Sequence, residues 1–413
     1  MRTVEHARAT DHLGRYYTHG EISQLLIELL PNPSPRALLD LGAGEGALSV
    51  AASSKWPNID LITVDVDRDA SCILSKRLKD GGFRGKHHYL PNDALCCDLQ
   101  SLLSDRAIGP INAAVCNPPF LVPRWRKEYS HILEDAGFSG SLPAITSTDA
   151  AALFLAQNLR ILSAGGSLGI IIPDSLACAE KYLGFRSSLL QNYDVVQAIR
   201  LPRGSFTGTD ALAHILVVSK RQPACSSIRL SCLASVKGPL QTIHVERDLA
   251  VRRLDYSYHV AQVTSAATTL RLRDVVINLQ RGSLNSAEVR ASSSFVLHTT
   301  DISADMRGRW LNFDKRAFRP SVISSNVAIA EAGDIILGRV GRNASEKVVG
   351  IGKGRIALSD CLFRIRVQPE YRELVLSSIA SEDGKRWMDM QAYGVAARHI
   401  AKSDLLNLPL DCS

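Results

Sequence analysis

Short apolar runs alternate with longer mixed stretches through the first half of the chain. Residues 37–41, 59–64 and 111–116 are strand-length runs rich in Leu, Ile, Val and Ala, and each is followed by a polar residue or a glycine. Residues 22–30 and 149–162 are apolar stretches of helical length. Strands and helices that alternate in this way are typical of an open α/β sheet, in which ligands bind at the carboxyl ends of the strands. The pattern predicts a Rossmann-like sheet with a ligand site at one rim.

A glycine-rich turn follows the first of these runs. Gly42, Gly44 and Gly46 separate the predicted strand from a predicted helix. Glycine lets the backbone approach a bound molecule closely, and the start of a helix offers unpaired N–H groups. A nucleotide-phosphate loop needs Lys-Ser/Thr after the glycines, which is lacking here, whereas the small Ala47 is compatible with the dinucleotide spacing. The turn predicts close approach of a ligand and leaves dinucleotide binding open.

Carboxylates follow the next two predicted strands. Asp65 stands about twenty residues beyond the glycine turn, where a carboxylate can hold both hydroxyls of a ribose. Asp93 follows the short run Tyr89–Leu90 and is suited to accept a hydrogen bond from an adenine amino group. Together with Asp40 and Asn117, these side chains are expected to line one rim of the sheet.

The tetrapeptide Asn117-Pro118-Pro119-Phe120 directly follows the run 111–116. Its prolines stop helix formation and fix the backbone, so the Asn117 side-chain oxygen and the Pro118 carbonyl can act together as acceptors. An exocyclic amine on an aromatic base is a poor nucleophile, because its lone pair is delocalised into the ring. Two acceptors aimed at its N–H bonds localise that pair on nitrogen, and Phe120 would stack on the base. The tetrapeptide predicts methyl transfer to an amino nitrogen; the alternative is a proline-rich turn that closes a strand.

The order of these motifs resembles the gamma group of adenine-N6 DNA methyltransferases. Residues 14–18 and the following apolar helix are similar to the amino-terminal motif that closes over the cofactor, although His19 stands where the family usually has Pro. Residues 165–175 resemble the strand after the fourth helix, and residues 201–218 resemble the motif whose Phe stacks on the opposite face of an extruded base. The resemblance covers roughly residues 14–220.

This resemblance implies S-adenosylmethionine as the cofactor and a flipped adenine clamped between Phe120 and Phe206. Asn117, Pro118, Pro119 and Phe120 would be the catalytic residues. The implied cofactor-binding residues are Tyr17, Thr18, Asp40, Gly42, Gly44, Gly46, Asp65, Asp93 and Asn117. Asp174 is expected at a turn or helix cap, and His214 as a buried histidine.

Composition and charge extend this interpretation to the rest of the chain. The 413 residues contain no signal-like first segment and no long uncharged apolar run, so a cytoplasmic protein of prokaryotic type without membrane insertion is expected. The nine cysteines lack paired spacing, which predicts reduced thiols and no metal site. The net charge of +7 arises entirely in residues 226–413, as a polyanion-binding domain requires, although a solvated basic face is the alternative.

Residues 228–413 resemble one target-recognition domain of type I specificity subunits, and residues 1–222 would form the catalytic domain. Three places carry this resemblance: Arg253–Tyr258, Gly333–Gly341, and 394–400 together with 404–409. The resemblance implies a mixed α/β module that recognises DNA, so double-stranded DNA is the expected partner. The predicted DNA contacts are Arg339, Arg342, Asn343, Lys347 and Lys353, and, in a mobile loop expected over the site, Arg124, Trp125, Arg126 and Lys127.

The resulting hypothesis is a site-specific DNA methyltransferase that modifies N6 of adenine, in a restriction-modification or related system. A dimer is one way to read a bipartite site, and a separate endonuclease is a possible partner because no nuclease motif set is recognised. Four alternatives stay open: cytosine N4, RNA or a protein glutamine as the methyl acceptor, and a subunit active only with partner chains.

Overall fold

The computed structural model describes residues 18–32, 34–95, 98–207, 209–265, 270–292, 295–313, 327–341, 343–395 and 397–410. The chain divides into two compact units, Met1–Tyr256 and Ser257–Ser413. The first unit contains one sheet and the second contains two, and each unit is described by itself.

A nine-stranded sheet organises the first unit, in the order β3-β2-β1-β4-β5-β7-β6-β8-β9. Its strands are β1 (Ala37–Leu41), β2 (Asp60–Val64), β3 (His87–Leu90), β4 (Ala113–Cys116), β5 (Ser167–Pro173), β6 (Asp194–Arg200), β7 (Ala213–Ser219), β8 (Ser227–Leu233) and β9 (Leu240–Glu246). β3, β2, β1, β4 and β5 run parallel, whereas β7 is antiparallel to both of its neighbours. The carboxyl ends of β1 to β4 therefore meet at one rim, as the apolar pattern predicts.

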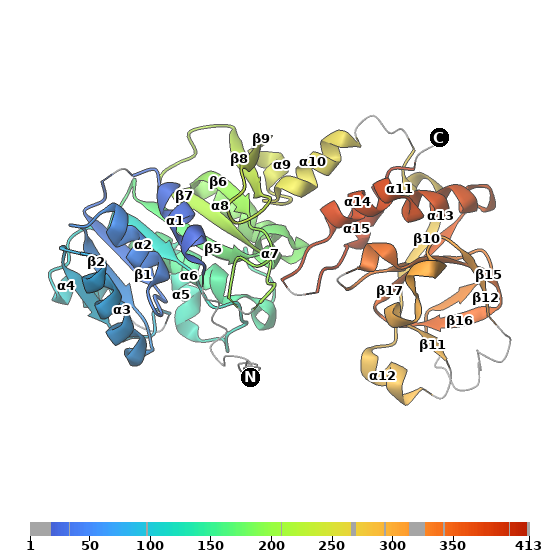
Figure 1. The fold of residues 1–413 in the computed structure, drawn as a ribbon, viewed down its shortest axis with the longest axis horizontal. Coiled ribbons are helices and arrows are strands. Elements are labelled where there is room, and N and C mark those ends of the chain that lie inside the picture. Colours follow the sequence, from blue (N-terminus) through green and yellow to red (C-terminus); the bar gives the residue numbers. More distant parts are fainter. Residues whose placement is uncertain are drawn as a thin grey trace, which may run out of the picture. The chain divides into compact units, whose positions relative to one another are not determined.

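Helices flank this sheet (Figure 1). They are α1 (Gly20–Glu28), α2 (Ala47–Lys55), α3 (Arg68–Asp80), α4 (Leu99–Asp105), α5 (Lys127–Asp135), α6 (Ala150–Ile161), α7 (Asp174–Cys178), α8 (Leu183–Asn192) and α9 (Arg247–Ala250), with short 3-10 turns at Ile145–Ser147 and Glu180–Tyr182. β1 is buried along its whole length, and the first ten residues of α6 are buried on every side. A helix apolar on all faces must lie inside the fold, and this one packs against β5 and α5.

The second unit is also mixed α/β. One sheet has the order β10-β17-β14-β15-β12 and the other β11-β16-β13. The strands are β10 (Val276–Arg281), β11 (Val296–Leu297), β12 (Trp310–Asn312), β13 (Ile329–Glu331), β14 (Ile335–Gly338), β15 (Val348–Lys353), β16 (Arg355–Leu358) and β17 (Leu362–Val367). The helices are α10 (Tyr256–Thr264), α11 (Leu272–Val275), α12 (Ser286–Ala291), α13 (Arg372–Ala380), α14 (Glu382–Gln391) and α15 (Lys402–Leu405), with 3-10 turns at 299–301, 304–306, 344–346 and 369–371. The predicted fold class, a Rossmann-like sheet followed by a mixed α/β domain, is confirmed.

The boundary between the units differs from the expected one near residues 222–228. β8 pairs in parallel with β6, and β9 pairs with β8, so residues 227–246 extend the first sheet. The stretch Arg253–Tyr258, expected within the second domain, is divided by the boundary, because residues up to Tyr256 belong to the first unit. Polar composition near residue 222 marks a turn between strands and not the end of the domain.

The stretch between Phe120 and α6, expected as a mobile loop, contains a helix. Residues 127–135 form α5, whose inner face buries Tyr129, Ile132 and Leu133. The described residues contain no helix that is both long and apolar enough to span a membrane.

Candidate functional site

The glycine turn joins the ends of β1 and β2. The N–H groups of Gly42 and Ala43 donate to the Val64 carbonyl, at 2.8 and 3.3 Å, and this holds the turn against the neighbouring strand. Gly46 has a φ of +77°, and a Cβ there would lie 2.2 Å from a methyl carbon of Leu74. A side chain at this position would therefore be both strained and in collision, which explains the glycine.

A cavity of about 520 Å³ opens beside this turn, within the range of small-molecule sites. It brings together residues from the carboxyl ends of β1, β2, β3 and β4. The predicted site residues in its lining are Thr18, Asp40, Gly42, Gly44, Gly46, Asp65, Asp93, Asn117, Pro119, Arg124 and Arg126. Tyr17 and Arg342 lie outside the described residues.

Asp40 is the most perturbed acid of the cavity. It is 1% exposed, and its Oδ2 accepts a 2.6 Å hydrogen bond from Ser49 Oγ. Its Oδ1 is buried and has no hydrogen-bond partner among the described residues. Burial raises the pKa of Asp40 to about 7, and the nearby charge of Asp65 adds to the effect, whereas the Ser49 hydroxyl opposes it. Asp40 is thus a buried acceptor at the cavity wall that a cationic or hydrogen-bond-donating ligand would satisfy.

Asp65 and Asp93 already accept hydrogen bonds within the protein. The two oxygens of Asp65 accept from the N–H groups of Gly44 and Asp67, at 2.7 and 2.8 Å. Asp93 accepts from the Leu95 N–H at 3.0 Å through Oδ1, and its Oδ2 lies 3.3 Å from Arg126 Nη1. Each carboxylate keeps further lone pairs, so these contacts orient the groups without exhausting them.

Asn117 stands directly beyond β4, at the same rim. Its Nδ2 donates a 2.9 Å hydrogen bond to Thr18 Oγ1, across 99 positions of sequence. Pro118 is buried, and Pro119 lines the cavity. The amino end of the Asn117 amide is therefore bound by protein, so its carbonyl end is the acceptor suited to a substrate.

Phe120 and Phe206 also come together, but not as two parallel plates. Their ring centroids lie 6.1 Å apart with an interplanar angle of 76°, an edge-to-face contact. Phe206 is 2% exposed and forms isolated backbone bridges to Thr18 and Thr209. Neither ring lines the cavity. A base inserted between them would require one ring to turn.

The basic residues expected near the mouth have different environments. Arg124, Arg126 and Lys127 are exposed, and Lys127 begins α5. Trp125 packs edge-to-face on the buried Tyr129, with ring centroids 5.5 Å apart. Trp125 is thus partly a packing residue of the helix start.

Two of the predicted DNA contacts in the second unit bind protein carbonyls. Arg339 Nε donates to the Asp360 carbonyl at 2.8 Å, and Lys347 Nζ donates to the Ile302 carbonyl at 2.5 Å. Asn343 precedes the 3-10 turn 344–346, and Lys353 is exposed at the end of β15. Of these four residues, Asn343 and Lys353 are exposed, and Lys353 is the exposed cation.

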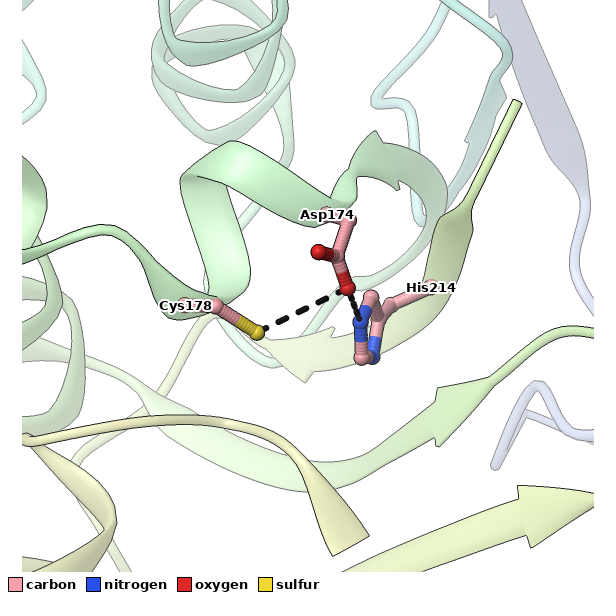
Figure 2. A group of neighbouring side chains, drawn as sticks. All are labelled: Asp174, Cys178 and His214. Carbon is pink, nitrogen blue, oxygen red and sulfur yellow. Dashed lines mark hydrogen bonds and ion pairs between the residues drawn. The ribbon is translucent and has the colours of Figure 1, made fainter. Parts of the chain in front are cut away.

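Asp174, Cys178 and His214 form a buried cluster at the end of β5 (Figure 2). Asp174 Oδ1 lies 2.8 Å from His214 Nε2 and 3.6 Å from Cys178 Sγ. Burial, followed by the charge of Asp174, raises the pKa of the Cys178 thiol well above its ordinary value, so the sulfur stays protonated. The three side chains form a hydrogen-bonded core cluster whose potential ligand atoms lie within 4.8 Å of one another. His214 is a buried strand histidine, as predicted, and Asp174 begins α7.

Several lining residues were not foreseen from the sequence. Tyr129 of α5 and Phe154 of α6 line the cavity from helices, where an aromatic residue at an apolar position looks like an ordinary core residue. Arg77 of α3 donates to the Glu45 carbonyl at 2.8 Å and also reaches the lining. Only the tertiary fold brings these side chains to the rim.

Two family models match the first unit. Residues 17–137 match the model described as Methyltransferase small domain, and residues 87–237 match the model described as N-6 DNA Methylase. The second match includes Asn117 to Phe120. Together with the sheet, these matches define the class: the first unit has the fold of an S-adenosylmethionine-dependent methyltransferase.

The chain is also similar to individual proteins. Ribosomal RNA large subunit methyltransferase G of Aeromonas salmonicida (strain A449) is 33% identical over 101 residues, which are 24% of this chain and 24% of that protein. The tRNA1(Val) (adenine(37)-N6)-methyltransferase of Shewanella halifaxensis (strain HAW-EB4) is 22% identical over 189 residues, 46% of this chain and 68% of that protein. The type IIG restriction endonuclease BpuSI aligns with 94% of this chain at 13% identity and a TM-score of 0.51, a likeness of fold. The chain spans about a quarter of the length of the first relative and 57% of BpuSI.

Proposed function

We propose that this chain is a site-specific DNA methyltransferase that modifies N6 of an adenine extruded from duplex DNA, as part of a restriction-modification or related system. One observation carries the proposal: Asn117 and Pro119 of the Asn-Pro-Pro-Phe segment share one cavity with the glycine turn. The residues proposed to bind the target amine and those proposed to bind the cofactor thus lie at the same rim of the sheet. The match of residues 87–237 to the N-6 DNA Methylase model supports the same chemistry.

The cavity suits S-adenosylmethionine. Gly44 has open space where a Cβ would stand, and the buried Asp40 Oδ1 calls for a donor. Asp65 would hold the ribose and Asp93 the adenine amino group, with the glycine turn and Thr18 completing the wall. When bound, the cofactor would supply an electrophilic methyl group to the target nitrogen, with sulfur as the leaving atom and one proton lost from the nitrogen.

The protein's own residues prepare the nucleophile. The Asn117 carbonyl oxygen and the Pro118 carbonyl accept hydrogen bonds from the two N–H groups of the target amine. These hydrogen bonds draw the nitrogen lone pair out of conjugation with the ring. Phe120 stacks on the base, with Phe206 turning to cover its other face. A strong general base is not required, because the N–H proton becomes acidic as the nitrogen is methylated.

Duplex DNA is the proposed partner of the second unit. Its residues, 257–413, carry five of the seven excess positive charges, and its two sheets with flanking helices fit a target-recognition domain. Lys353 and Arg339, with Arg342 and Asn343 nearby in sequence, would contact the backbone or the bases. A companion endonuclease or a dimer would complete such a system.

RNA is the second candidate substrate. The observation that favours it is the 22% identity over 189 residues with a tRNA (adenine-N6)-methyltransferase. That enzyme, too, would need an acceptor pair for an adenine amine, so the site chemistry does not separate the two substrates. The second unit favours DNA, because the tRNA enzyme matches less than half of this chain.

The deciding experiment offers the purified chain tritiated S-adenosylmethionine with unmethylated duplex DNA or with RNA of the same sequences. The product is digested, and the labelled nucleoside is identified. Label in N6-methyldeoxyadenosine supports the proposal, whereas label only in RNA or in N4-methylcytosine replaces it. No label on either nucleic acid, despite measured cofactor binding, would point to a partner-dependent subunit or a protein substrate.

Two variants and a control connect the result to the site. Asn117→Ala and Phe120→Ala are expected to lose methyl transfer while still binding the cofactor. Asn192→Ala removes an exposed asparagine whose Nδ2 donates to the Gly137 carbonyl, away from the cavity, and should keep normal transfer. Near-normal turnover in Asn117→Ala would contradict the assignment of Asn117 as a catalytic residue.

A further inference from the structure

The geometry points to Thr18 as a positioning residue for catalysis, acting on Asn117 through its hydroxyl group. The inference deepens the proposed function and rests on it, since the sequence assigns Thr18 to cofactor binding alone. It concerns the orientation of the amide that accepts the target amine.

Thr18 contacts two of the residues that would hold the target base, Asn117 and Phe206. Its Oγ1 accepts the 2.9 Å hydrogen bond from Asn117 Nδ2, and its backbone forms an isolated bridge with Phe206. The next residue, His19, donates its N–H to the Ser205 carbonyl at 3.3 Å. The segment before α1 is thereby fixed to the segment that carries Phe206, with the Thr18 side chain at the cavity wall.

This hydrogen bond determines which end of the amide is offered to a substrate. The terminal torsion of an asparagine side chain is broad and roughly two-fold, so its oxygen and nitrogen exchange places at little cost unless a partner fixes them. A target amine has only N–H groups to offer at this point and therefore needs the oxygen. Binding of Nδ2 by Thr18 leaves Oδ1 as the acceptor. Thr18 thus selects the productive orientation of Asn117.

The test compares Thr18→Val, which keeps the shape but removes the hydroxyl, with Thr18→Ser, which keeps the hydroxyl. The readouts are the single-turnover rate of methyl transfer at saturating cofactor and the cofactor Kd from calorimetry. For Thr18→Val we expect a rate loss of roughly 10- to 100-fold, typical of a misplaced reacting group, with a much smaller change in cofactor Kd. Thr18→Ser should recover most of the rate. Thr242→Val serves as the matched control, because it removes a hydroxyl that pairs with Ser231 Oγ at 2.8 Å on the edge of the sheet.

Each outcome bears on the inference. A normal rate in Thr18→Val overturns it, and so does a Kd increase that accounts for the whole rate loss, because Thr18 would then serve the cofactor. Equal impairment of Thr18→Ser and Thr18→Val also overturns it, because the hydroxyl would not be the active feature.

Methyl transfer by the wild-type chain distinguishes a failure of the proposed function from a failure of this inference. Rates are measured on whichever substrate the wild-type chain labels, so an RNA or protein acceptor changes the proposed function but leaves the role of Thr18 testable. If the wild-type chain labels nothing, crystal structures of the wild-type protein and Thr18→Val decide. The inference expects the Asn117 amide to be rotated or to adopt two orientations in the variant, and an unchanged amide overturns it.

Discussion

Arg126 and Asp93 form an ion pair at the cavity, with Nη1 of the arginine 3.3 Å from Oδ2 of the carboxylate. The sequence assigns these two residues to different ligands, Arg126 to DNA and Asp93 to the cofactor adenine. Their side chains are 51% and 39% exposed, and exposed ion pairs contribute only about 0–1 kcal/mol. The pair is therefore weak enough to open when either ligand arrives.

Replacement of Arg126 by Gln is expected to affect the two ligands in opposite directions. Removal of the competing cation frees Asp93 Oδ2, so cofactor affinity should stay constant or rise by up to about fivefold. DNA affinity should fall, and the slope of its logarithm against log salt should become shallower by about one, as for the loss of one phosphate contact. Calorimetry with the cofactor and DNA titrations at several salt concentrations provide the measurements. An unchanged salt slope would remove Arg126 from the DNA contacts.

Phe120 and Phe206 should differ in their effect on stability although both serve the same base. Phe206 is buried, so Phe206→Leu should lower the melting temperature, whereas Phe120→Leu, at a half-buried position, should change it little. Both variants should slow methyl transfer, because a base held between the rings loses stacking on one face. Thermal melts and single-turnover rates of the two variants separate these effects. A Phe206→Leu protein with normal transfer would mean that its ring does not reach the base.

The raised pKa of Asp40 predicts that the stability of the protein falls as the pH rises. Burial raises its folded pKa to about 7 from an ordinary value of 3.8, so the folded state holds a proton that the unfolded chain has released. Its contribution to stability is therefore complete below pH 3.8 and is lost as the pH rises through about 7. Asp40→Asn keeps an acceptor for Ser49 and cannot ionise. Without cofactor, the melting temperature of the variant should exceed that of the wild type most at pH 8 and less at pH 5, and the two should be similar below pH 3.8. Equal melting temperatures at pH 8 would show that Asp40 ionises there without cost.

Local signals in the sequence are sufficient for the strands of the catalytic unit and for its rim. Leu38, Leu39 and Leu41 form a buried run before a glycine turn, and the carboxyl ends of parallel strands necessarily meet. The domain boundary could not be placed in the same way. The polar turn near residue 222 looks like a domain end, although β8 and β9 follow it in the same unit. Their attachment to β6 depends on hydrogen bonds between strands, which leave little trace in the sequence pattern.

The site could be predicted as a set of residues but not as a set of contacts. Asp40, Asp65, Asp93 and Asn117 come from strand ends and reach one cavity, as the topology requires. The hydrogen bond between Thr18 and Asn117 spans 99 positions, so no periodicity could indicate it. The edge-to-face arrangement of Phe120 and Phe206 depends in the same way on side-chain packing.

Arg186 gives a test of the extended first unit. It is 1% exposed on α8, and its guanidinium donates to the carbonyls of Leu176 and Ala179, at the end of α7, and to those of Val251 and Arg252, in the segment before the second unit. Arg186→Met would remove all four of these hydrogen bonds, at a cost of roughly 3–5 kcal/mol in the free energy of unfolding. Arg186→Lys should lose less, and the exposed Arg106→Met should lose almost nothing. Urea unfolding gives the three values. Equal stability of Arg186→Met and Arg106→Met would show that the segment 247–256 does not depend on this arginine for its place on the catalytic unit.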